Sequence, residues 1–238
     1  MPAFRTRRNI VIGLCSSPLA SAPLAVLAQG VNVPKAGTDY TVLANPQPVE
    51  SGDKIEVLEF FQYSCPHCYA FTPDLNAWRK HLAADVEYRR VPIAFDPSVQ
   101  THVQLYYTLE ALNKIDDMHD KVFNAFHVNH RQLIEPGDIA EFMASNGIDR
   151  AQWVAAFNSF SVVTKAARAK RIAVAYEITG TPTMACDGKY ETAPSMIHIE
   201  PGIDRARAGE MARTGALDVM AYLIERSRRE RGRGGKKK

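Results

Sequence analysis

The stretch KIEVLEFFQYSCPHCY, residues 54–69, places two cysteines directly after a strand-like run of residues. Residues 54–61 are rich in β-branched and aromatic side chains and follow Ser51-Gly52-Asp53, which together predict a strand. Residues 69–84 predict a helix, bent at Pro73, because apolar side chains recur at three- and four-residue spacing: Phe71, Leu75, Trp78 and Leu82. The Cys-x-x-Cys motif therefore lies where a strand passes into a helix.

At a helix start, Cys65 and Cys68 would lie on the same face, so their sulfurs can meet. Pro66 suits the first helical turn, because the backbone N–H group that proline lacks would have no hydrogen-bond partner within the helix at that position. The free N–H groups and the positive end of the helix dipole would stabilise a Cys65 thiolate and lower its pKa. His67 can add a hydrogen-bond donor or a positive charge.

A stabilised thiolate favours the reduced pair, so the disulfide is easily passed on and the pair should be an oxidant. We expect Cys65 to be the exposed, attacking sulfur and Cys68 to be buried and to resolve the mixed disulfide. The alternative is a structural zinc site, but that would need two further ligands and the chain has no second Cys pair. Cys186 with a histidine is the weaker way to complete such a site.

The rest of the chain changes its periodicity twice. Residues 86–93 predict another strand, whereas residues 96–177 have helical periodicity and predict four or five helices, with a stop at Asn146-Gly147 and a cap at Asp149. Strand signals return at residues 183–186 and 189–192 around a hairpin turn at Asp187-Gly188, before a final helix at residues 216–226. We therefore expect an α/β unit with an inserted helical block.

Both ends of the sequence differ from the body. Residues 1–28 have three arginines, an apolar run and small residues up to Ala28, which predicts a signal peptide cleaved near Ala28. An uncleaved anchor or an amphipathic start is the alternative. Residues 227–238 are basic and contain glycine, so we expect a disordered tail. Without the signal and residues 225–238, the body has 18 basic and 24 acidic residues, which argues against nucleic-acid binding.

Phe60-Phe61, Cys65-Pro66-His67-Cys68-Tyr69, the helical insertion and Thr181-Pro182, in that order, resemble the DsbA family of periplasmic thiol:disulfide interchange proteins. The resemblance runs from about residue 40 to residue 226. It implies a thioredoxin-like domain in two parts, residues 29–95 and 178–226, with an all-helical insertion at residues 96–177.

The resemblance also implies roles for individual residues. Pro182 would be in the cis form, and Thr181 would lie beside the disulfide, pair with an extended substrate and tune the redox pair. Glu59 matches a buried acid that assists proton movement. Substrates would be unfolded secreted proteins held in an apolar groove near the active site, and a DsbB-like membrane oxidase would reoxidise Cys65 and Cys68. We expect a periplasmic monomer that needs neither cofactor nor metal.

Two features depart from the family pattern. Cys186 is an additional cysteine that we expect to be a buried, small apolar residue of a strand, with a regulatory thiol as the alternative. The basic tail is expected to be a solvated end, with loose attraction to anionic lipid as the alternative. Among the histidines of the helical block, His127 and His130 would share a helix face, although packing is favoured over a metal site for them.

Three functions are compatible with these residues. The favoured one is donation of the Cys65–Cys68 disulfide to newly exported proteins through a mixed disulfide. An isomerase or reductase is the second, but it would need a dimerisation domain or a less oxidising pair. The third is a non-redox chaperone in which the cysteines are incidental.

Overall fold

The computed structural model describes residues 33–234, so the predicted signal peptide and residues 235–238 lie outside the described part of the chain. A five-stranded sheet has the order β1-β5-β4-β2-β3. β2 and β3 are parallel and the other neighbouring pairs are antiparallel. The strands are β1 (Thr41–Val42), β2 (Ile55–Phe61), β3 (Val86–Pro92), β4 (Thr183–Cys186) and β5 (Tyr190–Thr192). The helices are α1 (Pro66–Arg79), α2 (Gln100–Ala111), α3 (Ile115–His127), α4 (Pro136–Ser145), α5 (Arg150–Phe157), α6 (Phe160–Ala175) and α7 (Arg205–Gly234), with short 3-10 turns η1 (Pro97–Val99) and η2 (Pro194–Met196).

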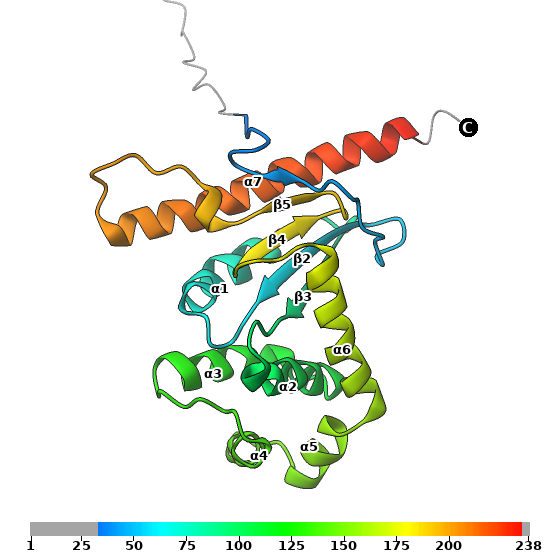
Figure 1. Ribbon diagram of the computed structural model, residues 1–238, viewed down its shortest axis with the longest axis vertical. Coiled ribbons are helices and arrows are strands. Elements are labelled where there is room, and N and C mark those ends of the chain that lie inside the picture. The colour runs from blue at the N-terminus through cyan, green and yellow to red at the C-terminus, as the bar shows by residue number, and fades with distance from the viewer. Residues whose placement is uncertain (1–32, 235–238) are drawn as a thin grey trace, which may run out of the picture. The chain divides into compact units, whose positions relative to one another are not determined.

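Every residue of β2 is buried, because helices cover both faces of the sheet (Figure 1). On one face Val57 packs with α1 and α7, where Phe71 and Leu75 of the predicted apolar stripe are fully buried. Burial of a side chain of this size stabilises the fold by about 1.5–3 kcal/mol. On the other face Leu58 and Phe60 join the core of the helical segment. Because β2 is buried on both faces, its end at Phe61 is fixed in position, and the cysteine motif begins four residues later at Cys65.

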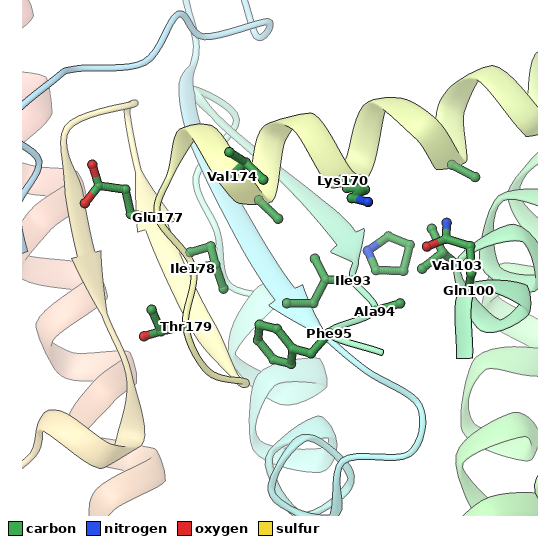
Figure 2. Close-up of a pocket in the computed structure, with 13 residues that line it drawn as sticks. Ile93, Ala94, Phe95, Gln100, Val103, Lys170, Val174, Glu177, Ile178 and Thr179 are labelled. Carbon is green, nitrogen blue, oxygen red and sulfur yellow. The ribbon is translucent and has the colours of Figure 1, made fainter. Parts of the chain in front are cut away.

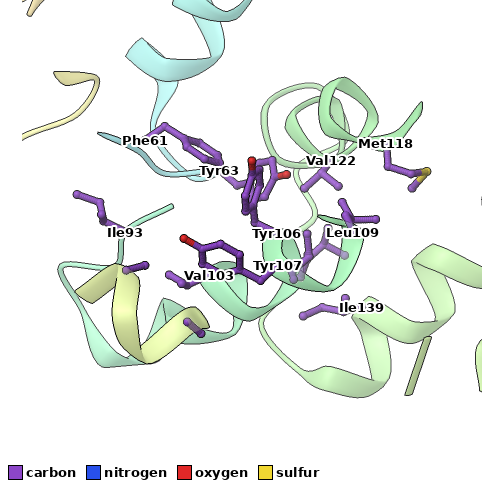
Figure 3. Packing of buried hydrophobic residues seen from close by; sticks show 14 of the residues in the cluster. Phe61, Tyr63, Ile93, Val103, Tyr106, Tyr107, Leu109, Met118, Val122 and Ile139 are labelled. Atoms are coloured by element: carbon purple, nitrogen blue, oxygen red, sulfur yellow. The ribbon is translucent and has the colours of Figure 1, made fainter. Parts of the chain in front are cut away.

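The five helices α2 to α6 lie between β3 and β4 in the chain, as the change of periodicity predicted. Their buried side chains continue the core from the end of β2, where Phe61 and Tyr63 meet Tyr106 and Val122 (Figure 3). Asp149 caps α5, as predicted, because its Oδ1 accepts a hydrogen bond from the N–H of Gln152 at 2.8 Å. No helix within residues 33–234 is both long and apolar enough to cross a bilayer.

The predicted hairpin between β4 and β5 is confirmed. Asp187 and Gly188 both have positive φ, 54° and 66°, and the turn is closed by a 3.0 Å hydrogen bond from the N–H of Lys189 to the carbonyl oxygen of Cys186. Cys186 pairs with Tyr190, so three residues connect the strands, one more than predicted. Gly188 is also needed for space, because a Cβ atom there would lie 2.0 Å from the carbonyl oxygen of Gln47.

The expected bounds of two helices are wrong. α1 begins at Pro66 and ends at Arg79, earlier than the predicted residues 69–84, and Pro73 lies within it. The expectation of a disordered tail is contradicted up to Gly234, because α7 continues to that residue.

The extension of α7 has partners that hold it against the body. Ser227 is fully buried, and Arg228 pairs with Asp85, the Nε and Oδ2 atoms being 2.6 Å apart. Arg231 pairs with Asp187, whose side chain is only 3% exposed. The basic composition therefore reflects ion pairs with the rest of the protein up to this point, and not a solvated end.

Candidate functional site

Cys65 is the N-cap of α1, in the extended conformation that capping residues adopt. Its Sγ accepts a hydrogen bond from the N–H of Cys68 at 3.4 Å. The strand ends at Phe61 and the helix begins at Pro66, so the sulfur takes the place that a capping hydroxyl or carboxylate oxygen would occupy. Cys65 is half-buried, whereas Cys68, one turn into the helix, is fully buried.

The two thiols are shifted in opposite directions. The pKa of Cys65 is lowered to about 5, mainly by a hydrogen bond from the Cys68 thiol, against the opposing effect of burial. The Thr181 side chain and the backbone N–H groups of Cys68 and His67 lower it further. Burial raises the pKa of Cys68, and the bond to Cys65 adds to that rise. The pair therefore carries one thiolate at neutral pH, on the more exposed sulfur.

The Thr181–Pro182 peptide bond is cis, as the family resemblance implied. The loop brings Thr181 against the cysteine pair, and its carbonyl oxygen lies 3.3 Å from the Sγ of Cys65. Pro182 is buried, and β4 begins at the next residue. Residues 116 positions apart in the sequence thus meet at the start of α1.

Pro66 and His67 are both exposed. Pro66 occupies the first helical position, as predicted. The contribution of His67 to the Cys65 thiolate comes through its backbone N–H group.

Glu59 lies in β2 and is 1% exposed. Its Oε2 atom accepts hydrogen bonds from the hydroxyl of Tyr88 and from Nε of Arg90, the latter at 3.0 Å. Arg90 also donates to Oδ1 of Asn76 on α1 at 3.0 Å. Within the described residues, the hydrogen bonds of Glu59 go to β3 and none reaches a cysteine sulfur. Glu59 is thus half of a buried ion pair with Arg90, whose side chain is 3% exposed.

Sequence reasoning did not identify Tyr88 and Arg90, although both lie in the predicted strand. The parallel pairing of β2 with β3 sets Glu59 beside Arg90, and only a known register could have revealed this. The register follows from three-dimensional packing, since one residue of slip would turn Arg90 to the other face.

Three histidines of the helical block, His102, His119 and His127, pack against aromatic rings, whereas His130 is exposed. His119 is buried and its Nδ1 lies 2.9 Å from the hydroxyl of Tyr63, while His127 stacks on the Tyr69 ring at 4.8 Å between centroids. The expectation that His127 and His130 share a helix face is wrong, because α3 ends at His127 and His130 has a positive φ of 54°.

Cys186 is fully buried on β4, as expected. Burial raises its pKa to about 12, and its Sγ lies 3.7 Å from the Oγ of Ser227. A thiol in this state has little thiolate character, so the observations favour the structural role over the regulatory one.

Two cavities adjoin the loop that leads to Pro182. A groove of about 650 Å³ is lined by His67, Thr181 and Pro182 together with residues of β5 and α7. A second cavity, of about 360 Å³, lies beyond the same loop, where Ile93, Phe95 and Ile178 come together below the last turns of α6 (Figure 2). Glu177, Ile178 and Thr179 line both cavities. Apolar side chains therefore line surface on both sides of this loop, and the groove that contains Thr181 also has polar and ionisable side chains.

The comparisons with known proteins agree on one family. The family model of the DSBA-like thioredoxin domain matches residues 56–205. The Thiol:disulfide interchange protein DsbA of Pseudomonas aeruginosa is 37% identical over 221 residues, which are 93% of this chain and 97% of the relative. The protein of the same name from Bordetella parapertussis is 40% identical over 219 residues, 91% of this chain and 96% of the relative.

Solved structures give the same result. The crystal structure of Pseudomonas aeruginosa DsbA has a TM-score of 0.74 at 36% identity and covers 83% of this chain and 96% of its own. That of the oxidoreductase DsbA from Xylella fastidiosa has a TM-score of 0.71 at 29% identity, covering 82% and 98%. These likenesses confirm the predicted thioredoxin-like fold with an inserted helical domain, and the enzyme class of a thiol:disulfide oxidoreductase.

Proposed function

Because the chain belongs to the DSBA-like thioredoxin domain family, we propose that it oxidises newly exported proteins by passing them the disulfide of Cys65 and Cys68. The observation that carries this proposal is the opposite shift of the two thiols. A pKa of about 5 for Cys65 favours the reduced pair, and a favoured reduced pair is a strong disulfide donor.

The reaction proceeds by two displacements. A substrate thiolate attacks the half-buried Sγ of Cys65, the Cys65–Cys68 bond breaks, and its electron pair leaves on Cys68, which takes up a proton. A second substrate thiolate then attacks the substrate sulfur of the mixed disulfide, and the electron pair leaves on Cys65 as a thiolate. The substrate loses two electrons and the pair gains them, while a low pKa makes Cys65 a good leaving group.

The neighbouring residues tune this pair. Pro66 holds the first helical turn, and the N–H of His67 stabilises the thiolate. Thr181 contacts the Cys65 sulfur, and with Pro182 it would hold an extended substrate chain beside the disulfide. Glu59 would assist proton movement from its buried pair with Arg90.

We place the reaction in the periplasm, after removal of a signal peptide cleaved near Ala28, and expect the protein to act as a monomer. The reduced pair must return two electrons to an oxidant before the next turnover. A DsbB-like membrane oxidase would accept them and restore the disulfide.

The test is disulfide transfer from the oxidised protein to a reduced, unfolded substrate protein with two cysteines. Wild-type protein and Cys186→Ser should both oxidise the substrate stoichiometrically. Cys65→Ser should lose the activity, and Cys68→Ser should accumulate a mixed disulfide when it is charged with an activated substrate thiol. Refolding of the substrate by Cys65→Ser at the wild-type yield would instead support a non-redox chaperone.

A further inference from the structure

The groove beside the cysteine pair has an acidic wall. Four ionisable side chains line it: His67, Glu177, Glu191 and Arg213. Arg213 is neutralised, because its Nε donates to Oδ2 of Asp74 at 2.6 Å. Neither Glu177 nor Glu191 has an ion-pair or hydrogen-bond partner for its carboxylate within residues 33–232. The groove thus has an excess of unpaired negative charge.

Glu191 is the more unusual of the two. It lies on β5, between Thr41 of β1 and Ala185 of β4, on the face of the sheet that carries Leu58. Its Oε1 atom is removed from solvent and accepts no hydrogen bond from any described group. A buried acceptor without a donor is costly, so a positive charge near the Glu191 carboxylate would offset an existing penalty.

Glu191 lies at a useful distance from the reacting sulfur. The carbonyl oxygen of Thr181 is 3.3 Å from the Sγ of Cys65, and the chain runs from there through Pro182 to Ala185, the pairing partner of Glu191. Ala185 is four residues after Thr181, and four residues of extended chain span about 13 Å. A substrate chain lying beside this loop with its cysteine at Cys65 would bring a side chain about three or four residues away to the acidic wall.

We propose that Glu191, assisted by Glu177, selects substrate segments that carry a lysine or arginine two to four residues from the cysteine being oxidised. The inference rests on the proposed function and adds a specificity to it. The charge of a cationic side chain in the groove would be attracted by both carboxylates, neither of which has an ionic partner within residues 33–232. An acidic side chain in the same place would meet two like charges.

The ionisation of Glu191 supports this assignment. Burial raises its pKa to about 7, and the charge of Glu177 adds to the rise. The ionisable groups around the groove and the adjoining β5 are Tyr176, His67, the Arg213–Asp74 pair, and Lys189, which pairs with Asp187 and Glu230. The uncharged polar residues that line the groove are Thr41, Thr179, Thr181, Thr183 and Ser195. Selection for a cation should therefore strengthen as the pH rises from about 6 to about 8, as Glu191 becomes ionised.

The experiment compares dithiol peptides that differ only in the residue three positions from one cysteine: lysine, alanine or glutamate. The rate of oxidation, as kcat/KM, is measured with the oxidised wild-type protein, Glu191→Gln and Glu177→Gln. Glu135→Gln is the matched control, because it removes the same charge from an exposed position on the helical segment. For each protein, kcat/KM for the lysine peptide is divided by kcat/KM for the glutamate peptide. Dividing this ratio by the ratio found for Glu191→Gln removes the difference in intrinsic reactivity between the two peptides.

Wild-type and Glu135→Gln protein should prefer the lysine peptide over the glutamate peptide about tenfold at slightly alkaline pH, equivalent to ~1.4 kcal/mol. Glu191→Gln should lose most of this preference and its pH dependence, with an unchanged reduction potential of the cysteine pair. Glu177→Gln should lose a smaller part.

Equal peptide ratios in wild-type protein and Glu191→Gln would overturn the inference while leaving disulfide donation intact. Failure of the wild-type protein to oxidise any of the peptides would instead count against the proposed function. If Glu191→Gln does not fold, the wild-type ratio across the same pH range decides, since a ratio that does not change would exclude a titrating carboxylate.

Discussion

The low pKa of Cys65 should be visible in how the reduction potential changes with pH. Reduction of the disulfide takes up two electrons and one proton for each sulfur that remains protonated. With a pKa of about 5 for Cys65 and a raised pKa for Cys68, only one proton is taken up between about pH 5.5 and 8.5. Each proton contributes about 30 mV per pH unit to a two-electron couple. The potential should therefore fall by about 30 mV per pH unit in this range and by about 60 mV per unit below pH 5.

The same shift sets how oxidising the pair is. An unperturbed thiol has a pKa of about 8.5 and is protonated at pH 7. The pKa of Cys65 lies about two pH units below pH 7, so ionisation of its thiol stabilises the reduced pair and raises the reduction potential by about 60 mV. Because Cys65 is only half-buried, solvent screening reduces this, and about 30–60 mV is expected. The stabilisation is complete above the pKa of the unfolded thiol and is lost as the pH falls through the folded value of about 5.

The assay is equilibration with glutathione buffers from about pH 4.5 to 8.5, corrected for the pH dependence of glutathione itself, with thiolate absorbance followed in the reduced protein. Cys186→Ser should give the same slopes, because that thiol lies apart from the pair and its pKa is raised to about 12. A slope of about 60 mV per unit throughout the range would mean that Cys65 stays protonated, and the explanation by capping hydrogen bonds would be refuted.

Three substitutions test other contacts. Thr181→Val removes one hydrogen bond to the Cys65 thiolate and should make the potential more negative by about 10–30 mV in glutathione buffers, and an unchanged value would exclude that bond. Arg90→Met leaves Glu59 buried without its cation and should lower the free energy of unfolding in urea by about 3–5 kcal/mol. Adding Glu59→Gln should recover part of this loss, whereas additive losses would argue against a coupled pair. Arg231→Ala leaves Asp187 with Lys189 alone, whose Nζ is 3.9 Å from Oδ2, and should cost about 1–3 kcal/mol in urea unfolding. A loss near zero would show that the end of α7 frays in solution.

Local sequence was sufficient to predict the cysteine site because its chemistry is local. A strand run, a proline in the first helical turn and a three-residue spacing place both sulfurs at one helix end without knowledge of the rest of the fold. The hairpin at Asp187-Gly188 was predictable for the same reason, since two residues determine the turn.

Features that depend on distant partners were not predictable. Composition suggested a disordered tail, but Arg228 and Arg231 find Asp85 and Asp187, which precede them by 143 and 44 residues. Glu191 gave no signal either, because its significance lies in the absence of a partner for its carboxylate among residues 33–232 of the folded chain. Charge along a sequence shows how many ion pairs are possible, and only the fold determines which of them form.

The opposite shifts of Cys65 and Cys68 are linked by one hydrogen bond, and this link directs the reaction. In the reduced pair the Cys68 thiol donates to Cys65, which lowers one pKa and raises the other. In the mixed disulfide Cys65 carries no charge and no longer raises the pKa of Cys68. Burial alone still raises the pKa of Cys68. Cys68 then remains a protonated, weakly nucleophilic thiol that rarely expels the substrate unoxidised. The second substrate thiolate meets no such barrier, because the group that it displaces is the low-pKa sulfur of Cys65.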